Sequence, residues 1–281
     1  MKDVDERMKD VDERLNRLED NVRNLTSLIK FILERADGDI RPIKSSTRTN
    51  TLELVDTATG RYFLPKDAHA DAIAADIKAG RIFEQYVYDT AVKYIKEDTI
   101  VLDIGSNFGQ MAIMMARHVG AKGMVHAFEA NDFVFDILRR NVEENHARIK
   151  PHFCAVHNVG GETLYFPEPD FRRFGTYGSY GIDYVGHQGK PVTTLAIDDL
   201  EFDMPVSFIK IDVQGGDLFA MQGAVKTIEK YKMPILFEYE KEFEAEQGYT
   251  FQQYLDFIES INYHIAEKLG DHDFLIMPNK S

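Results

Sequence analysis

The chain has 281 residues, of which 44% are hydrophobic, and its net charge is −14. These values suit one sizeable α/β domain with an appendage, and the negative charge argues against a nucleic-acid partner, whose phosphates it would repel. The single cysteine, Cys154, excludes a disulfide framework and a thiolate zinc site. Because the sequence shows neither a signal peptide nor a transmembrane segment, we expect a cytoplasmic protein.

Residues 1–36 carry a heptad pattern typical of a coiled coil. The segment MKDVDER occurs twice in succession, and apolar residues then recur in steps of four and three. The pattern predicts that residues 1–35 assemble a homo-oligomer. The run RLNRLE resembles one associated with parallel trimers, so we expect a trimer ahead of a dimer. A single amphipathic helix folded back on its own domain is the alternative. The polar segment 37–50 is interpreted as a linker.

From residue 51 to residue 281, strand and helix patterns alternate, with an N-terminal part at 51–97 and a core at 98–281. The expected elements in chain order are strands at 51–55 and 61–64, helices at 68–79 and 82–95, a strand at 100–104, a helix at 108–118, a strand at 123–129, a helix at 132–146, strands at 149–156, 162–166, 192–196 and 206–213, a helix at 217–230, a strand at 234–239, a helix at 250–262, and strands at 263–269 and 273–277. The last two strands are joined by a short turn. They therefore form an antiparallel hairpin, which adds one reversed strand to an otherwise parallel sheet.

A glycine turn joins the first core strand to the helix after it. The sequence TIVLDIGSNFGQ, residues 99–110, has an apolar run that ends at Asp103, followed by Gly105, Asn107 and Gly109. A strand, a glycine turn and a helix form a nucleotide-type binding corner, because glycine lets the backbone approach a ligand closely. The third glycine of the dinucleotide fingerprint is missing, and a tight turn without a ligand is the alternative.

The second core strand also ends in an acid, Glu129, about one βα unit after Asp103. This separation is expected of a carboxylate that binds a ribose in such folds. A carboxylate at this position can accept hydrogen bonds from both vicinal hydroxyls of the sugar. A solvated acid at the end of a strand is the alternative.

The loop between the strands at 162–166 and 192–196 is rich in glycine and tyrosine. Because long loops beside a site often contact ligands, Tyr177 and Tyr180 are candidates to stack on sugar rings and to donate hydroxyl groups. His187 lies in the same loop and is a further candidate for contact with the substrate. A surface loop without a ligand is the alternative.

Four segments together resemble the FkbM methyltransferase family in order and spacing, over roughly residues 80–278. They read VLDIGSNFG, HAFEANDFVFDILRRNVEEN, FIKIDVQGGDLFAMQGA and PILFEYE. The resemblance implies a Rossmann-like class I methyltransferase fold, with a seven-stranded α/β sheet that is mostly parallel and has a reversed C-terminal hairpin strand. There is one departure, because Asp217 stands where the family usually has Glu.

The resemblance also implies S-adenosyl-L-methionine as the cofactor and methyl transfer to a hydroxyl, often on a sugar or a polyketide-like product. Glu129 would then hold the ribose. The other cofactor-binding residues implied are Asp103, Gly105, Ser106, Asn107 and Gly109 around the methionine part, Ala130 and Asn131 beside the ribose, and Ala155 and Val156 beside the adenine.

Asp212 and Glu238 end neighbouring strands of the expected sheet, where ligands bind in such folds. An alcohol must lose its proton as it attacks a methyl group, so we predict Asp212 as the base or the orienting group and Glu238 as its assistant. Two close carboxylates would raise the pKa of one of them. Three alternatives remain open: that Asp212 caps a helix, that Glu238 is a plain acid at the end of a strand, and that His187 is the base. Both acids could share Mg²⁺, but no pattern requires it and no metal site is predicted.

Three functions compete at this point. The first is an S-adenosylmethionine-dependent O-methyltransferase acting on a glycan or small-molecule hydroxyl. The second is a nicotinamide-dependent oxidoreductase, since the first two βα units would serve either cofactor. The third is an inactive oligomeric scaffold.

Overall fold

The computed structural model describes residues 52–66, 68, 71–168, 176–184, 186 and 188–280. The predicted coiled coil and linker lie outside the described residues, as does His187. Within the described ranges, no helix is long and apolar enough to cross a membrane.

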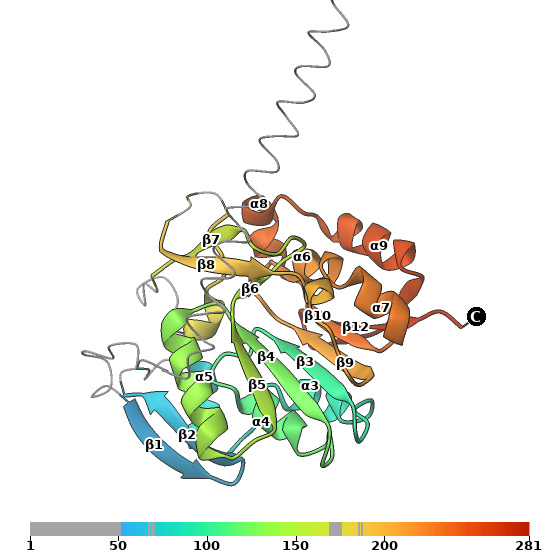
Figure 1. Cartoon of the computed structure of the whole chain (residues 1–281). Coiled ribbons are helices and arrows are strands. Elements are labelled where there is room, and N and C mark those ends of the chain that lie inside the picture. The colour runs from blue at the N-terminus through green and yellow to red at the C-terminus, as the bar shows by residue number, and fades with distance from the viewer. Residues whose placement is uncertain are drawn as a thin grey trace, which may run out of the picture. The chain divides into compact units, whose positions relative to one another are not determined.

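The described core is built on a seven-stranded sheet with the strand order β11-β12-β10-β9-β3-β4-β5 (Figure 1). Its strands are β3 (Ile100–Ile104), β4 (Met124–Glu129), β5 (Ile149–Phe153), β9 (Val206–Ile211), β10 (Ile235–Glu238), β11 (Tyr263–Leu269) and β12 (Asp273–Pro278). Strand β12 is antiparallel to both of its neighbours, β10 and β11, while the other pairs are parallel. The predicted mixed sheet with one reversed strand is confirmed.

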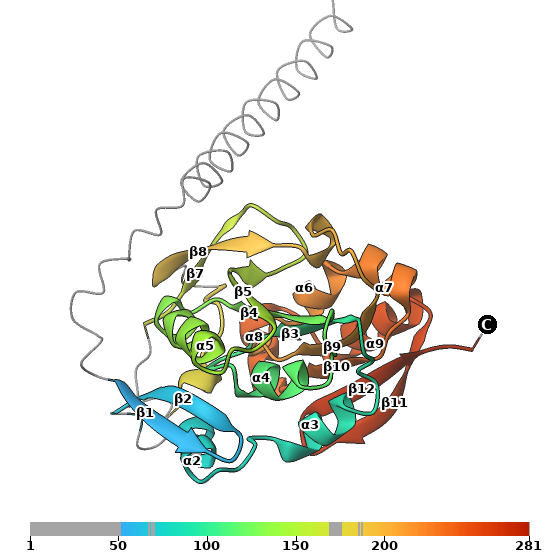
Figure 2. The same ribbon diagram turned by 60° about the horizontal axis from the view of Figure 1, so that its bottom comes forward.

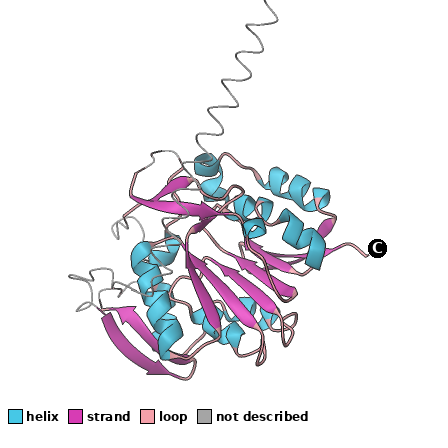
Figure 3. Cartoon of the chain, viewed as in Figure 1, coloured by secondary structure: helices cyan, strands magenta, loops and turns pink. Residues whose placement is uncertain are grey.

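Helices cover both faces of this sheet (Figure 3). Every residue of β3 is buried, and its side chains alternate between two apolar clusters, with Val101 in one and Leu102 in the other. The first cluster includes residues of α3 (Gln85–Ala91), α4 (Gln110–Ala116) and α5 (Asp132–Glu144), and the second includes residues of α6 (Asp217–Gln222), α7 (Val225–Tyr231) and α9 (Phe251–Ser260). A short helix, α8 (Glu244–Gln247), lies between β10 and α9 in the chain.

The N-terminal part adds an antiparallel hairpin, β1 (Leu52–Thr57) and β2 (Gly60–Pro65), and the helix α2 (Ala72–Lys78) (Figure 2). Two side-chain amides, one in α5 and one at its C-cap, attach the hairpin to the core. The Oδ1 atom of Asn141 accepts a hydrogen bond from the Phe63 N–H at 2.6 Å, and that of Asn145 accepts one from the Arg61 N–H at 3.0 Å. The hairpin is therefore fixed to a helix that follows a strand of the site.

A second sheet has the order β6-β8-β7, with strands β6 (Ala155–Val156), β7 (Thr163–Phe166) and β8 (Lys190–Leu195). The single strand predicted at 149–156 is therefore wrong. The chain leaves the main sheet at Cys154, because Ala155 pairs with Thr194 of β8 instead of with β4. This departure brings Ala155 and Val156 to the end of the main sheet.

The helix predicted at 217–230 is also divided in the structure, into α6 and α7. The division lies at Gly223, where a Cβ atom would sit 2.1 Å from the carbonyl oxygen of His157. The Gly223 carbonyl accepts a hydrogen bond from the Asp198 N–H at 2.9 Å instead of continuing the helix. A close backbone contact with a distant segment therefore ends α6.

Candidate functional site

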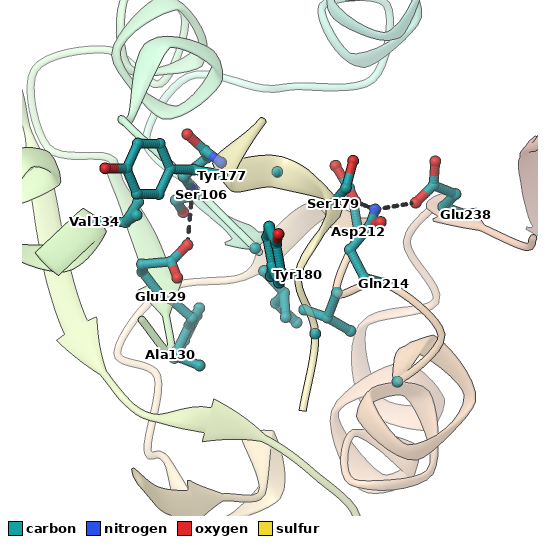
Figure 4. Close-up of a pocket in the computed structure, with 18 of the residues that line it drawn as sticks. Ser106, Glu129, Ala130, Val134, Tyr177, Ser179, Tyr180, Asp212, Gln214 and Glu238 are labelled. Carbon is teal, nitrogen blue, oxygen red and sulfur yellow. Dashed lines mark hydrogen bonds between the residues drawn. The ribbon is translucent and has the colours of Figure 1, made fainter. Parts of the chain in front are cut away.

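A cavity of about 330 Å³ opens at the carboxyl ends of β3, β4, β9 and β10, within the range of small-molecule sites. Figure 4 shows Ser106 and Glu129 on one side of it and Asp212 and Glu238 on the other, with Tyr180 between them. The predicted residues that line the cavity are Gly105, Ser106, Asn107, Glu129, Ala130, Ala155, Val156, Tyr177, Tyr180, Asp212 and Glu238.

The glycine turn after β3 forms the floor of this cavity. Its backbone is held against β4, because the N–H groups of Gly105 and Ser106 donate to the carbonyl of Phe128 at 3.0 and 2.9 Å. Gly105 has a φ of +82°, and a Cβ atom there would lie 1.7 Å from the carbonyl oxygen of Asp212. Only glycine fits this contact, so the turn brings β3 and the end of β9 together.

Glu129 ends β4 and lies on the same side of the cavity as the glycine turn. Its Oε2 accepts a hydrogen bond from the Asn107 N–H at 3.0 Å, and its Oε1 accepts one from the Asn131 N–H at 2.8 Å. Burial raises the pKa of Glu129 to about 7, although these backbone donors oppose the shift. Asn131 does not line the cavity, since its side chain caps α5 by accepting from the Phe133 N–H at 3.0 Å.

Asp103, predicted at the methionine part of the ligand, lies behind the turn and does not line the cavity. It is fully buried, and neither carboxylate oxygen has a hydrogen-bond partner among the described residues. Burial raises the pKa of Asp103, and the nearby ammonium of Lys210, 4.0 Å away, opposes that shift. Gly109 also lies outside the cavity lining, where it begins α4 with a φ of 87°. Asp103 therefore lies behind Lys210, which does line the cavity.

Lys210 is a site residue that the sequence reasoning missed. It lines the cavity from β9, where its Nζ lies 2.9 Å from Oδ2 of Asp212 and 3.3 Å from the carbonyl of Gly105. Burial opposes its charge, but the carboxylates of Asp212 and Asp103 outweigh it and raise the pKa of the ammonium. A lysine inside the mostly apolar run VSFIKI was the available signal, since a buried cation needs a partner.

Gln214 connects the two predicted catalytic acids. Its Nε2 donates to Oδ1 of Asp212 at 3.1 Å and to Oε2 of Glu238 at 2.8 Å (Figure 4). Burial works against ionisation of Asp212, yet the charge and hydrogen bond of Lys210 hold its pKa below the usual value. Burial and the charge of Asp212 raise the pKa of Glu238 well above the usual value. The pair is therefore asymmetric, because the surroundings favour the charged form of Asp212 and the neutral form of Glu238.

Three residues of the cavity lining have left-handed backbones although none of them is glycine. Glu84 has a φ of 52°, Asn107 of 49° and Gln214 of 51°. Such strain is concentrated at functional sites, where the surrounding structure holds it in place. Glu84 comes from the N-terminal part, and burial together with the charge of Asp212 raises its pKa to about 8. No sequence pattern singled out Glu84.

Asp217, which departs from the family pattern, lies at the start of α6 and is fully buried. Its Oδ1 accepts a hydrogen bond from the Glu238 N–H at 3.1 Å, and its Oδ2 accepts one from the Val213 N–H at 3.4 Å. Burial and the charge of Asp212 raise its pKa to about 8. Asp217 therefore joins the ends of β9 and β10, and no helix-capping hydrogen bond comes from Asp212.

The two predicted tyrosines differ in their surroundings. The ring of Tyr177, which is 9% exposed, packs against Phe108 and Phe133 with centroid distances of 5.9 and 5.6 Å. Much of this ring is covered by protein, so Tyr177 anchors its loop more than it offers a face to a sugar. Tyr180 packs on the cluster that contains Ala155, beside the predicted adenine position.

The model described as the methyltransferase FkbM domain matches residues 103–265. The chain belongs to the FkbM methyltransferase family. No curated protein matches it. The family assignment decides against the nicotinamide-dependent hypothesis, and S-adenosyl-L-methionine is the methyl donor.

Similar solved structures have low sequence identity. The methyltransferase FkbM from Methylobacillus flagellatus KT is 17% identical, with 68% of this chain and 50% of that chain covered and a TM-score of 0.41. The chain thus spans half the length of that protein. An O-methyltransferase from Bacillus cereus, in complex with SAH, is 16% identical, with coverages of 73% and 86% and a TM-score of 0.45. Fibrillarin from Aeropyrum pernix, with natively bound S-adenosyl-L-methionine, is 15% identical, with coverages of 83% and 85% and a TM-score of 0.38.

The part of the cavity around Glu129 fits the ribose and the base of this cofactor. Both oxygens of Glu129 already accept backbone hydrogen bonds, and each carboxylate oxygen can accept a further one from a ribose hydroxyl. Ala155 and Val156 give an apolar surface next to it for a base. Glu129 and β6 are therefore the residues that would hold the adenosine part.

Binding of S-adenosylhomocysteine is expected to weaken as the pH falls through about 7, because protonation of Glu129 removes a hydrogen-bond acceptor. At pH values well below the pKa of Glu129, the affinity should fall by about tenfold for each pH unit. Titration calorimetry from about pH 6 to about pH 8 measures it. Without ligand, this group makes the folded protein less stable as the pH rises from 4.5 to about 7, since the folded chain keeps a proton that the unfolded chain has released.

Glu129→Gln is the control for that experiment. The amide does not titrate, so its affinity should be weaker than that of the unaltered chain at high pH and should not change over the same range. A pH dependence that survives in this variant would assign the effect to another acid, of which Glu84 is the first to examine.

Proposed function

We propose that this protein is an O-methyltransferase that transfers the methyl group of S-adenosyl-L-methionine to a hydroxyl, with a sugar or glycan as the acceptor. The observation that carries the proposal is the asymmetric pair Asp212 and Glu238, bridged by Gln214 across the cavity from Glu129. An ionised and a protonated carboxyl at one place suit the activation of an alcohol.

When bound, the cofactor supplies an electrophilic methyl group on a sulfonium cation. Its surroundings favour the ionised form of Asp212, so it can accept a hydrogen bond from the acceptor hydroxyl and take its proton as the new carbon–oxygen bond forms. Lys210 fixes Oδ2 of Asp212 at 2.9 Å and Gln214 fixes Oδ1 at 3.1 Å, which orients the carboxylate towards the reacting group.

Glu238 has a different role because burial and the charge of Asp212 raise its pKa and favour the protonated form. One of its oxygens accepts from Gln214, and the protonated carboxyl can donate a hydrogen bond to a second oxygen of the acceptor. Ser179 and Tyr180, which also line the cavity, add further hydroxyl groups. Several donors and acceptors around one cavity favour an acceptor with many hydroxyls, which supports a sugar.

Two measurements test the proposal on the full chain. Calorimetry should detect binding of S-adenosylhomocysteine and no binding of NAD. A screen of glycosides, oligosaccharides and nucleotide sugars with S-adenosyl-L-methionine, followed by mass spectrometry, should find a product heavier by one methylene group. Methylation on nitrogen or carbon alone would contradict the O-methyl assignment. Cofactor binding without any transfer would support the inactive scaffold.

Residues 1–35 lie outside the described residues, and the heptad pattern supports only a proposal for them. We infer that they assemble a homo-oligomer, with a trimer ahead of a dimer, and that the protein works in the cytoplasm.

A further inference from the structure

Residues 176–182, called the wall segment below, all line the cavity. The segment contains a single 3₁₀ turn, Tyr177–Ser179. At one end the segment lies beside the glycine turn, since a Cβ atom on Gly178 would be 3.5 Å from Nδ2 of Asn107. At the other end it lies beside the residue that bridges the two proposed catalytic acids, since a Cβ atom on Gly181 would be 2.7 Å from the carbonyl oxygen of Gln214. The wall segment therefore faces both the cofactor and the acceptor ends of the cavity.

One buried carboxylate holds the start of the wall segment. Asp71 is 0% exposed, and its Oδ2 accepts hydrogen bonds from the Tyr177 N–H and from the Thr176 hydroxyl, both at 2.8 Å. The Thr176 hydroxyl oxygen in turn accepts from the Gly178 N–H at 3.2 Å. The carboxylate thus fixes the turn by three connected bonds.

The other oxygen of Asp71 belongs to a different element. Oδ1 accepts a hydrogen bond from the Ala74 N–H at 2.8 Å and so caps the N-terminus of α2. In the same region a Cβ on Gly178 would lie 3.0 Å from Cδ1 of Ile73, so the turn packs directly on α2. The family match begins only at residue 103. A helix that precedes the matched region therefore supports the cavity.

We propose that Asp71 is a positioning residue for cofactor binding, which holds the wall segment in place and makes the N-terminal part a working component of the site. Asp71 touches neither reacting group. It acts through Thr176 and Tyr177, whose segment would swing away from the cavity if these bonds were lost. The proposal depends on the cofactor and is independent of which acceptor is used.

The test is Asp71→Asn in the full chain, with S-adenosylhomocysteine as the probe. The amide can keep the acceptor that caps α2, but its NH₂ group faces the Tyr177 N–H and cannot accept from it. We expect affinity to fall about tenfold, as for the loss of one hydrogen bond to a charged group. Hydrogen exchange should become faster at the amides of 176–182.

Asp198→Asn is the matched control, because Asp198 also accepts backbone bonds, from the N–H groups of Lys226 and Thr227 at 2.8 and 2.9 Å, but does not line the cavity. Its melting temperature should fall as much as that of Asp71→Asn, while its affinity should stay unchanged. Equal affinities in the two variants, or unchanged exchange of the wall segment, would overturn the proposal.

A second pair of variants answers the question if Asp71→Asn does not fold. Thr176→Val keeps the shape of the side chain but loses the hydroxyl that donates to Asp71, and it should weaken binding about threefold. Thr176→Ser keeps the hydroxyl and should restore the affinity of the unaltered chain. The same affinity in both would contradict the role of this bond.

Discussion

Gly105→Ala is expected to lower the affinity for S-adenosylhomocysteine by at least about 100-fold. It should also lower the melting temperature. The added Cβ would lie 1.7 Å from the Asp212 carbonyl oxygen, and that atom belongs to the backbone. The strand ends cannot separate freely, since the Asp212 N–H donates to the Ile104 carbonyl at 2.9 Å. Left-handed strain of about 1–2 kcal/mol adds to the clash.

Gly109→Ala separates these two causes. Gly109 has a similar φ of +87°, so the backbone strain is comparable, but its Cβ would meet Cδ1 of Leu138 at 2.5 Å. That atom is the end of a flexible side chain and can move. We therefore expect a loss of stability with a much smaller loss of affinity. If both variants bind equally poorly in calorimetry, the contact with Asp212 is not the cause.

Asp212→Asn is expected to reduce methyl transfer by about 10²-fold or more while cofactor affinity changes only a few-fold. The amide can keep a hydrogen bond to Lys210 but cannot take a proton from a hydroxyl. Single-turnover rates with the acceptor found in the screen measure the effect. Unchanged turnover would remove Asp212 from the mechanism.

Glu238→Gln is the matched control for this variant, because it replaces a protonated carboxyl with a neutral amide of the same shape. We expect a loss below about tenfold, as for one neutral hydrogen bond. Equal losses in the two variants would contradict the assignment of the charge to Asp212. A larger loss in Glu238→Gln would make Glu238 the base.

Much of the fold could be predicted because the central strands β3, β4, β9 and β10 are short runs of mostly apolar residues. The strand at 100–104 is confirmed to the residue, since both of its ends are marked by polar sequence. The divisions at Cys154 and Gly223 could not be predicted, because they depend on contacts with β8 and with His157, far away in the sequence. Local patterns contain no information on such contacts.

The site was predictable where chain topology alone decides it. Acids at the ends of parallel strands must meet at one edge of a sheet, which is why Glu129, Asp212 and Glu238 share a cavity. The difference in pKa between the two proposed catalytic acids was not predictable, because it depends on Lys210 within β9. The bond between Asp71 and Tyr177 joins residues 106 positions apart, and no sequence spacing indicates it.

The place of β12 in the main sheet has a consequence for biosynthesis. Strand β12 follows β11 in the chain, yet it lies between β11 and β10. While a ribosome is still making residues 273–278, β11 has no neighbour to join and the edge of β10 is open to other chains. A nascent chain without residues 273–278 therefore exposes a strand edge of the kind that pairs with other chains.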